Sequence, residues 1–435
     1  MKKLVSLLLA CVMVVACFGA CGNGGNKEGK MKIGVILVGD DTEGYTKAHM
    51  DGIKAAASEL GIADADIIWK YKVEENASCY DAAAELVGKG CKVIFSNSYG
   101  HQTFMVQAAE KYKNVKFVSM TGDFAAICGQ ENLSNAFTNV YESRYVSGVV
   151  AGLKLKELLE SNTLTASVQP DSFDANGNVK VGYVGAYDYA EVVSGYTAFY
   201  LGIKSVVSNV VMEVKYTDSW FDIDKEAAAA EALVASGCVI IGQHADSTGA
   251  PAAVQKLLDS GKICYSVGYN VDMLGTAPKA ALTSATNTWK VYYKDALQKA
   301  MNNEKIPTDW AEGYAKDAVA ITKLGDSCAA GTEEYVNGVV AKIKDGSLKI
   351  FDTAAFTVSK DQNTCTVTTD ANGHVTSCIV DFSFMDWSTN PATVVYQGEK
   401  IECIENGAFI ESKHRSAPYF SIRIDGISEN AEHIK

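Results

Sequence analysis

Short apolar runs alternate with amphipathic segments over the first half of this chain. The apolar runs predict strands at Lys32–Val38, Ile67–Val73, Val93–Asn97, Val115–Met120 and Ala136–Val140. The intervening segments have helical periodicity, at Tyr45–Leu60, Ser78–Gly88, Gln102–Tyr112 and Ser143–Leu159. Strands that alternate with helices in this way are typical of a parallel sheet with helices on both faces.

The second half of the chain repeats this plan. Strands are predicted at Val181–Val184, Val210–Tyr216, Val239–Gly242 and Ile263–Val267. Short sequences recur as well: Lys32-Ile33-Gly34-Val35, Gly52-Ile53-Lys54 and Gly90-Cys91 are matched by Lys180-Val181-Gly182-Tyr183, Gly202-Ile203-Lys204 and Gly237-Cys238. The repeat predicts two doubly wound α/β lobes of one design, and the cleft between such lobes is a usual place for a small ligand.

The remaining segments complete the predicted architecture. Ala281–Ala300 has the pattern of a strand followed by a helix, and we expect residues 273–350 to cross back to the first lobe. In residues 351–435, period-two alternation at Thr364–Thr369 and His374–Phe382 flanks Ala371-Asn372-Gly373, as in a hairpin. The predicted fold is therefore an α/β protein with parallel-sheet lobes at 32–142 and 143–272, joined by a hinge, and a β-rich C-terminal appendage.

The N-terminus has the pattern of a secretion signal. Lys2 and Lys3 precede an apolar run that ends at Gly19-Ala20, so residues 1–20 are predicted to be a signal peptide and 21–31 a polar tether. Phe18-Gly19-Ala20-Cys21 resembles a bacterial lipoprotein box, and the sequence around Cys17 also fits one. We favour Cys21 as the lipidated residue, because the polar linker begins directly behind it. The alternative is a cleaved signal without a lipid. The lipid would place the protein on the extracytoplasmic face of the cell membrane.

Composition narrows the possible partners and cofactors. The 435 residues suffice for two domains, and the formal charge of −13 becomes −15 without Lys2 and Lys3, which disfavours nucleic acid. Of 12 cysteines, nine remain after the signal and Cys21 are set aside, so a complete disulfide framework is excluded. The hairpin pairing would place Cys365 opposite Cys378, either as a disulfide or as two thiols. No CxxC pair is present, and we expect no metal and no cofactor.

Polar and aromatic residues follow the predicted strands, where ligands of doubly wound sheets bind. They are Tyr45, Ser98, Tyr99, Tyr187, Glu191, Trp220, His244, Asp246, Asn270, Asp272 and Trp289, with Glu142 at the head of the crossing helix. Flat rings together with carboxylates and an amide suit a planar, hydrogen-bonding ligand such as a nucleobase. In the alternative interpretation the rings pack the hinge and Glu142 only begins its helix. Catalytic motifs are missing apart from His244-Ala245-Asp246, so we expect no enzyme.

Five short segments carry a family resemblance. They are Phe95-Ser96-Asn97-Ser98-Tyr99-Gly100, Tyr141-Glu142-Ser143-Arg144-Tyr145, Ser219-Trp220-Phe221-Asp222, Gln243-His244-Ala245-Asp246-Ser247 and Trp289-Lys290-Val291-Tyr292-Tyr293. From about Lys32 to Phe351 the chain resembles the basic membrane protein family, the lipoprotein substrate-binding components of ABC importers. Ala245 replaces a frequent threonine of that family and Ser143 a frequent glycine, and residues after about Asp352 match no pattern of the family.

The resemblance implies a type I periplasmic-binding-protein fold and a purine nucleoside or nucleobase bound between the lobes. It implies stacking by Tyr45, Tyr99, Trp220 and Trp289, and hydrogen bonding by Glu142, Asp246 and Asp272. The expected partners are an ABC permease and its separate ATPase, and the protein is expected to be a monomer. Two other functions stay open at this point: a ligand-sensing receptor lipoprotein without transport, and a secreted nucleoside hydrolase.

Overall fold

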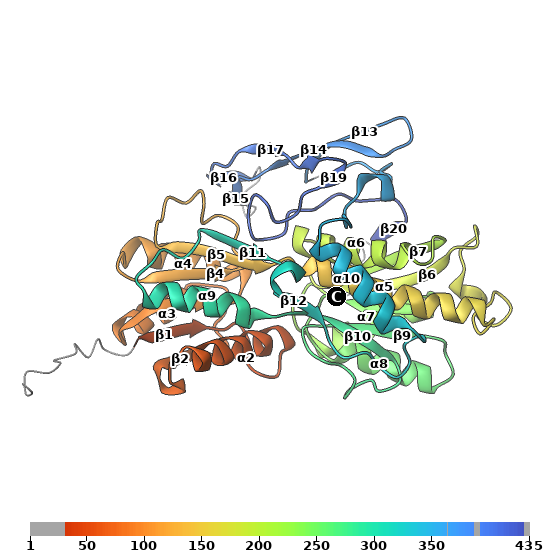
Figure 1. Ribbon diagram of the computed structural model, residues 1–435, viewed down its shortest axis with the longest axis horizontal. Coiled ribbons are helices and arrows are strands. Elements are labelled where there is room, and N and C mark those ends of the chain that lie inside the picture. The colour runs from red at the N-terminus through yellow and green to blue at the C-terminus, as the bar shows by residue number, and fades with distance from the viewer. Residues whose placement is uncertain (1–30, 363, 387–391, 430–435) are drawn as a thin grey trace, which may run out of the picture. The chain divides into compact units, whose positions relative to one another are not determined.

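The computed structural model describes residues 31–362, 364–386 and 392–429 (Figure 1). The predicted signal peptide and both candidate lipidation sites, Cys17 and Cys21, lie outside the described residues. Over the described ranges, no helix combines the length and apolar character needed to cross a membrane.

The first lobe is built on a six-stranded sheet in which every strand is parallel to its neighbours. In spatial order the strands are β11 (Asp309–Glu312), β5 (Leu133–Thr138), β4 (Lys116–Met120), β3 (Cys91–Ser96), β1 (Lys32–Ile36) and β2 (Ile67–Lys70). The connecting helices are α2 (Gly44–Glu59), α3 (Ser78–Gly88) and α4 (Gln102–Lys111). The predicted βα alternation is therefore confirmed, because each apolar run is buried as a strand under its amphipathic helices.

The second lobe repeats the arrangement on a seven-stranded sheet. In spatial order its strands are β12 (Val319–Ile321), β10 (Ala281–Asn287), β9 (Tyr265–Tyr269), β8 (Ile240–Gln243), β6 (Val179–Gly185), β7 (Val210–Tyr216) and β20 (Ile427–Glu429). Its helices are α5 (Val140–Glu160), α6 (Ala190–Lys204), α7 (Ile223–Ala235) and α8 (Gly249–Asp259). Only the edge strand β12 runs antiparallel to its neighbour, so the sheet keeps the doubly wound character expected.

The chain crosses between the lobes three times. It passes from β5 into α5, from β10 into α9 (Trp289–Met301), and from β11 into β12. Helix α9 packs on α2 and β11 joins the first sheet, whereas β12 and α10 (Thr332–Lys344) pack with the second lobe. Residues 273–350 therefore divide between the lobes instead of returning to the first lobe as a whole, because β10 pairs with β9 in the second sheet.

Five single 3₁₀ turns connect these elements. They are η1 (Asp64–Asp66), η2 (Tyr99–His101), η3 (Pro170–Ser172), η4 (Tyr314–Lys316) and η5 (Thr353–Ala355).

The repeated glycines have the same structural role in both lobes. A Cβ at Gly52 would lie 2.7 Å from the Cβ of Trp289 on α9, and one at Gly202 would lie 2.1 Å from the carbonyl oxygen of Tyr145 on α5. In each lobe, the glycine lets the helix that follows the first strand approach a crossing helix closely. Gly90 and Gly237 have φ of +87° and +105°, and both end a helix just before a buried strand.

The C-terminal segment is β-rich, as predicted, but it is not detached from the second lobe. Its strands are β13 (Thr366–Thr369), β14 (Val375–Asp381), β15 (Phe384–Asp386), β16 (Thr393–Tyr396), β17 (Lys400–Glu402), β18 (Ile404–Glu405) and β19 (Ala408–Phe409). Phe351 stacks on Phe420 with ring centroids 4.2 Å apart, and both belong to the second lobe's core. Strand β20 then extends the second sheet beside β7.

The cysteine pairing differs from the expected register. Strands β13 and β14 form the predicted hairpin, with Gly373 at φ +84°, but Cys378 stands opposite Val367 and not opposite Cys365. Cys365 directly precedes β13, so it is offset diagonally from Cys378. Both residues are free thiols.

The close contact of α5 with α6 predicts that Gly202→Ala lowers the free energy of unfolding by about 1–3 kcal/mol, because the added methyl group overpacks a backbone contact. The matched control is Gly338→Ala in α10, where a Cβ would meet no atom within 4 Å. That variant should gain about 0.5–1 kcal/mol from the reduced backbone entropy of the unfolded chain. Urea unfolding measures both, and equal stabilities would contradict the packing argument.

Candidate ligand-binding site

A small cavity lies between the lobes, at the carboxyl ends of both parallel sheets. This is the edge at which doubly wound sheets bind ligands. The first lobe contributes Val38, Glu43, Tyr45, Asn97, Ser98, Tyr99 and Thr121, and the second contributes Glu191, Trp220, His244, Asp246 and Tyr269. The lining thus combines four aromatic rings with three carboxyl groups.

On the first lobe, polar side chains that follow β1 and β3 hold the loops of the wall. The side-chain oxygen of Asn97 accepts a hydrogen bond from Val38 N at 2.9 Å, and its amide nitrogen donates to Thr46 Oγ1 at 3.0 Å. The Tyr99 hydroxyl donates to Asp123 Oδ2 at 2.9 Å. The Tyr45 ring packs edge-on against His49, with ring centroids 4.4 Å apart, and this contact supports the Tyr45 ring.

On the second lobe, Trp220 lies in the turn before α7, and the Asp222 side chain caps that helix by accepting from Lys225 N at 3.0 Å. Its ring contacts Tyr187 at 5.0 Å and Tyr189 at 6.0 Å. Tyr189 also approaches Tyr99 of the first lobe, with ring centroids 5.7 Å apart. These rings form an aromatic border on both sides of the cleft.

Asp246 is fixed by both lobes. The Asn270 side chain donates to the Asp246 carboxylate at 2.7 Å, and the Asp246 backbone N–H donates to Trp220 O at 2.8 Å. Its carbonyl oxygen accepts from Gly44 N at 3.4 Å across the cleft. Behind it, both carboxylate oxygens of Glu226 accept from Ser247 N at 3.1 Å, which holds the 243–247 loop against α7.

Burial changes the acid–base properties of these groups. Desolvation, opposed by the charge of Arg144, raises the pKa of Glu191 to about 7. Burial also raises the pKa of Asp246, and the charge of Glu43 on the other lobe raises it further. Burial lowers the pKa of His244, and Arg144 lowers it further, so the imidazole is neutral. The site can therefore present carboxyl groups both as acceptors and, when protonated, as donors.

Seven of the residues predicted from the sequence line the cavity. They are Tyr45, Ser98, Tyr99, Glu191, Trp220, His244 and Asp246. Tyr187 lies directly behind Trp220, and Asn270 lies behind Asp246, so both support lining residues without joining the lining.

Three predicted site residues lie elsewhere. Glu142 accepts a hydrogen bond from Tyr314 N at 2.7 Å and thereby joins the first and third crossings. Asp272 is exposed, and its carboxylate accepts from Leu274 N at 2.7 Å within its own turn. Trp289 is 1% exposed and stacks on His49 at 4.2 Å, behind Tyr45. All three side chains therefore make contacts within the protein and do not line the cavity.

Other lining residues were not singled out from the sequence. They are Val38, Glu43, Asn97, Thr121 and Tyr269. Asn97 and Thr121 directly follow β3 and β4, so the strand-end argument could have found them. Arg144 gave no such signal, because it lies inside α5; its guanidinium sits 3.6 Å from the ring centre of Tyr269.

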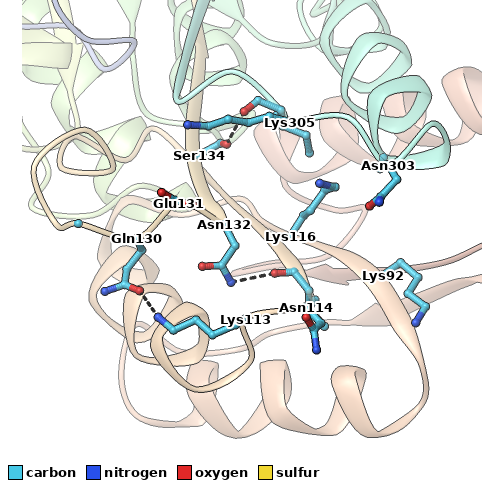
Figure 2. Close-up of a pocket in the computed structure, with 14 residues that line it drawn as sticks. Lys92, Lys113, Asn114, Lys116, Gln130, Glu131, Asn132, Ser134, Asn303 and Lys305 are labelled. Carbon is cyan, nitrogen blue, oxygen red and sulfur yellow. Dashed lines mark hydrogen bonds between the residues drawn. The ribbon is translucent and has the colours of Figure 1, made fainter.

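A second hollow lies at the opposite, amino-terminal edge of the first sheet. Figure 2 shows its lysines: Lys92, Lys113, Lys116 and Lys305. Lys92 and Lys116 stand at the starts of β3 and β4, and Lys113 follows the carboxyl end of α4, where a cation is favoured by the helix dipole. This hollow has no aromatic lining and is separate from the cleft. In the ranges that the structure describes, no group of three or more His, Cys, Asp or Glu side chains is placed to hold a metal ion.

Comparison with known proteins agrees with this geometry. The profile of the Bmp family, described as PnrA-like ABC transporter substrate-binding proteins, matches residues 30–354. A purine-binding protein of Brucella abortus (strain 2308) is 31% identical over 335 residues, which is 76% of this chain and 85% of the relative.

Solved structures show the same fold. A solute-binding protein of an ABC transporter system from Aeropyrum pernix K1 covers 77% of this chain and 95% of its own, with a TM-score of 0.60 and 14% identity. A solute-binding protein from Conexibacter woesei covers 73% and 98%, with a TM-score of 0.56 and 16% identity.

The family match extends through both lobes and the cleft between them. The members of this family are solute-binding proteins and not enzymes, as the missing catalytic motifs predicted. Such proteins act outside the cytoplasm, bind a small solute and interact with a permease. This chain belongs to the family of PnrA-like ABC transporter substrate-binding proteins.

Proposed function

We propose that this protein is a lipid-anchored receptor that binds a purine nucleobase or nucleoside in the interlobe cavity and delivers it to an ABC permease. The observation that carries the proposal is the cavity itself, in which aromatic rings and carboxyl groups from both lobes converge. The purine-binding relative from Brucella abortus supports the same ligand class.

The chemistry of a purine suits this lining. Trp220 and Tyr99 present flat π-surfaces from opposite lobes, and stacking of a base on an aromatic ring is worth about 1–3 kcal/mol. Ring nitrogens and exocyclic groups offer both donors and acceptors. Asp246 and Glu191 can accept from N–H groups, and a proton held by either carboxyl group can be donated to a ring nitrogen.

A ligand would also improve the electrostatics of the closed cleft. Glu43 and Asp246 face each other from different lobes, and burial penalises the charge of each. A ligand that donates a hydrogen bond to one of them satisfies a buried acceptor and offsets the repulsion between the two carboxyl groups. We therefore propose that ligand binding favours the approach of the lobes, as delivery to a permease requires.

The first test is a thermal-shift screen with adenine, guanine, adenosine, guanosine and inosine. A ligand at 100 times its Kd stabilises the folded state by about 2.7 kcal/mol, so at least one of these compounds should raise the Tm by several degrees. If none does, and calorimetry also detects no binding, the purine assignment is wrong.

We predict that Trp220→Ala weakens binding of the best purine about tenfold to a hundredfold, because one stacking face is lost. Isothermal titration calorimetry measures the affinity, and circular dichroism checks the fold. Trp69→Ala is the matched control, since Trp69 stacks on Tyr71 on the edge strand β2, outside the cavity lining. Equal affinities of the two variants would remove Trp220 from the site.

For the anchor, we predict that Cys21→Ala releases the protein from the membrane into the medium, because acylation of Cys21 is the proposed attachment. Cys17→Ala is the control and should stay on the membrane. Fractionation and metabolic labelling with a fatty acid distinguish the two. If Cys17→Ala is released and Cys21→Ala is retained, the attachment site is Cys17.

A further inference from the structure

The C-terminal segment goes beyond the family match, which ends at residue 354. It is anchored to the second lobe through the buried Glu411, whose carboxylate accepts from Ser194 Oγ on α6 at 3.0 Å. The same carboxylate accepts from Tyr419 N at 2.7 Å and Phe420 N at 2.9 Å. Residues 411–420, which we term the strap, are thus tied to the second lobe at both ends.

The middle of the strap contacts the first lobe. Ser416 donates from its backbone N–H at 2.9 Å and from its hydroxyl at 2.8 Å to Asp309 on β11. Arg415 Nη1 lies 3.6 Å from Asp123 Oδ2, the oxygen that accepts the hydrogen bond of the Tyr99 hydroxyl. The strap therefore connects the second lobe, through Arg415 and Asp123, to a ring that lines the ligand cavity.

This connection is mostly shielded from water. The Arg415 and Asp123 side chains are only 16% and 11% exposed, so their attraction is weakly screened. The guanidinium lies over the rings of Phe382 and Tyr419, at 5.3 and 5.9 Å, which orients it before any contact with the first lobe. The other carboxylate oxygen of Asp123 has no hydrogen-bond partner among the described residues, so Arg415 is its main counter-charge.

We propose that Arg415 is a positioning residue of the ligand site: through Asp123 it holds the Tyr99 ring in place from the opposite lobe. The proposal rests on the proposed function for its ligand. Because Arg415 is carried by the second lobe and Asp123 by the first, the ion pair adds to the stability of the closed arrangement. The strap thereby couples a segment outside the family's common core to the ligand.

The test compares Arg415→Ala with Lys413→Ala. Lys413 lies in the same strap, but it pairs with Glu405 inside the appendage and serves as the matched control. Calorimetry with adenine, or with the purine that the screen selects, should show Arg415→Ala binding about fivefold to tenfold more weakly and Lys413→Ala unchanged. Arg415→Lys should recover part of the loss.

Repeating the comparison in a Tyr99→Phe background distinguishes positioning of the Tyr99 ring by Arg415 from a purely structural role of Arg415. Without the hydroxyl, Asp123 no longer holds the ring, so Arg415→Ala should reduce affinity less than twofold further. An equal loss in both backgrounds would overturn the proposal.

Hydrogen exchange of the free protein gives a readout that needs no ligand. Backbone amides at 98–102 should exchange faster in Arg415→Ala than in Lys413→Ala, because the tie to Asp123 is gone. Unchanged exchange would overturn the proposal. If the unmodified protein binds no purine, the proposed function fails, and hydrogen exchange alone then decides the role of Arg415.

Discussion

The structure depends on three chain crossings that keep the carboxyl ends of two parallel sheets facing each other. Side chains join the crossings to one another: Glu142 accepts from Tyr314 N at 2.7 Å, and Thr138 donates to Asn287. A Cβ at Gly313 would lie 2.2 Å from the Glu142 carboxylate, so the third crossing passes very close to the first. Because the three crossings must move together, the lobes are limited to a hinge-like motion about these crossings.

The cleft that results is lined by groups that are costly to bury. Glu43, Glu191 and Asp246 lose hydration there, and the Arg144 guanidinium partly offsets this cost for Glu191 and Asp246. Burial raises the pKa of each carboxyl group, so these groups hold a proton more readily in the cleft than they would in bulk water. A buried carboxylate also gains more from a hydrogen bond that a ligand donates. Recognition in this cleft therefore depends as much on the desolvation of the acids as on the shape of the aromatic walls.

The C-terminal segment shows how an added element can reach an existing site without replacing any part of it. Strand β20 continues the second sheet, and Phe351, Phe356 and Phe420 enlarge its core. The free edge of a sheet offers unpaired backbone groups, so adding a parallel strand beside β7 is a favourable way to attach new chain. From that attachment the segment contacts Asp309 and Asp123 of the first lobe.

The sequence by itself determined the two βα lobes, their repeated glycines and the C-terminal hairpin, because hydrophobic period and turn chemistry are properties of neighbouring residues. It also indicated seven lining residues, since strand ends of a parallel sheet meet at one edge. Only the tertiary structure decided which carboxylates face the cavity. Glu142 turns to a backbone amide 172 residues away, Asp272 satisfies its own turn, and Asp246 meets Glu43 from the other lobe. These choices are made by long-range hydrogen bonds and burial, which no local pattern records.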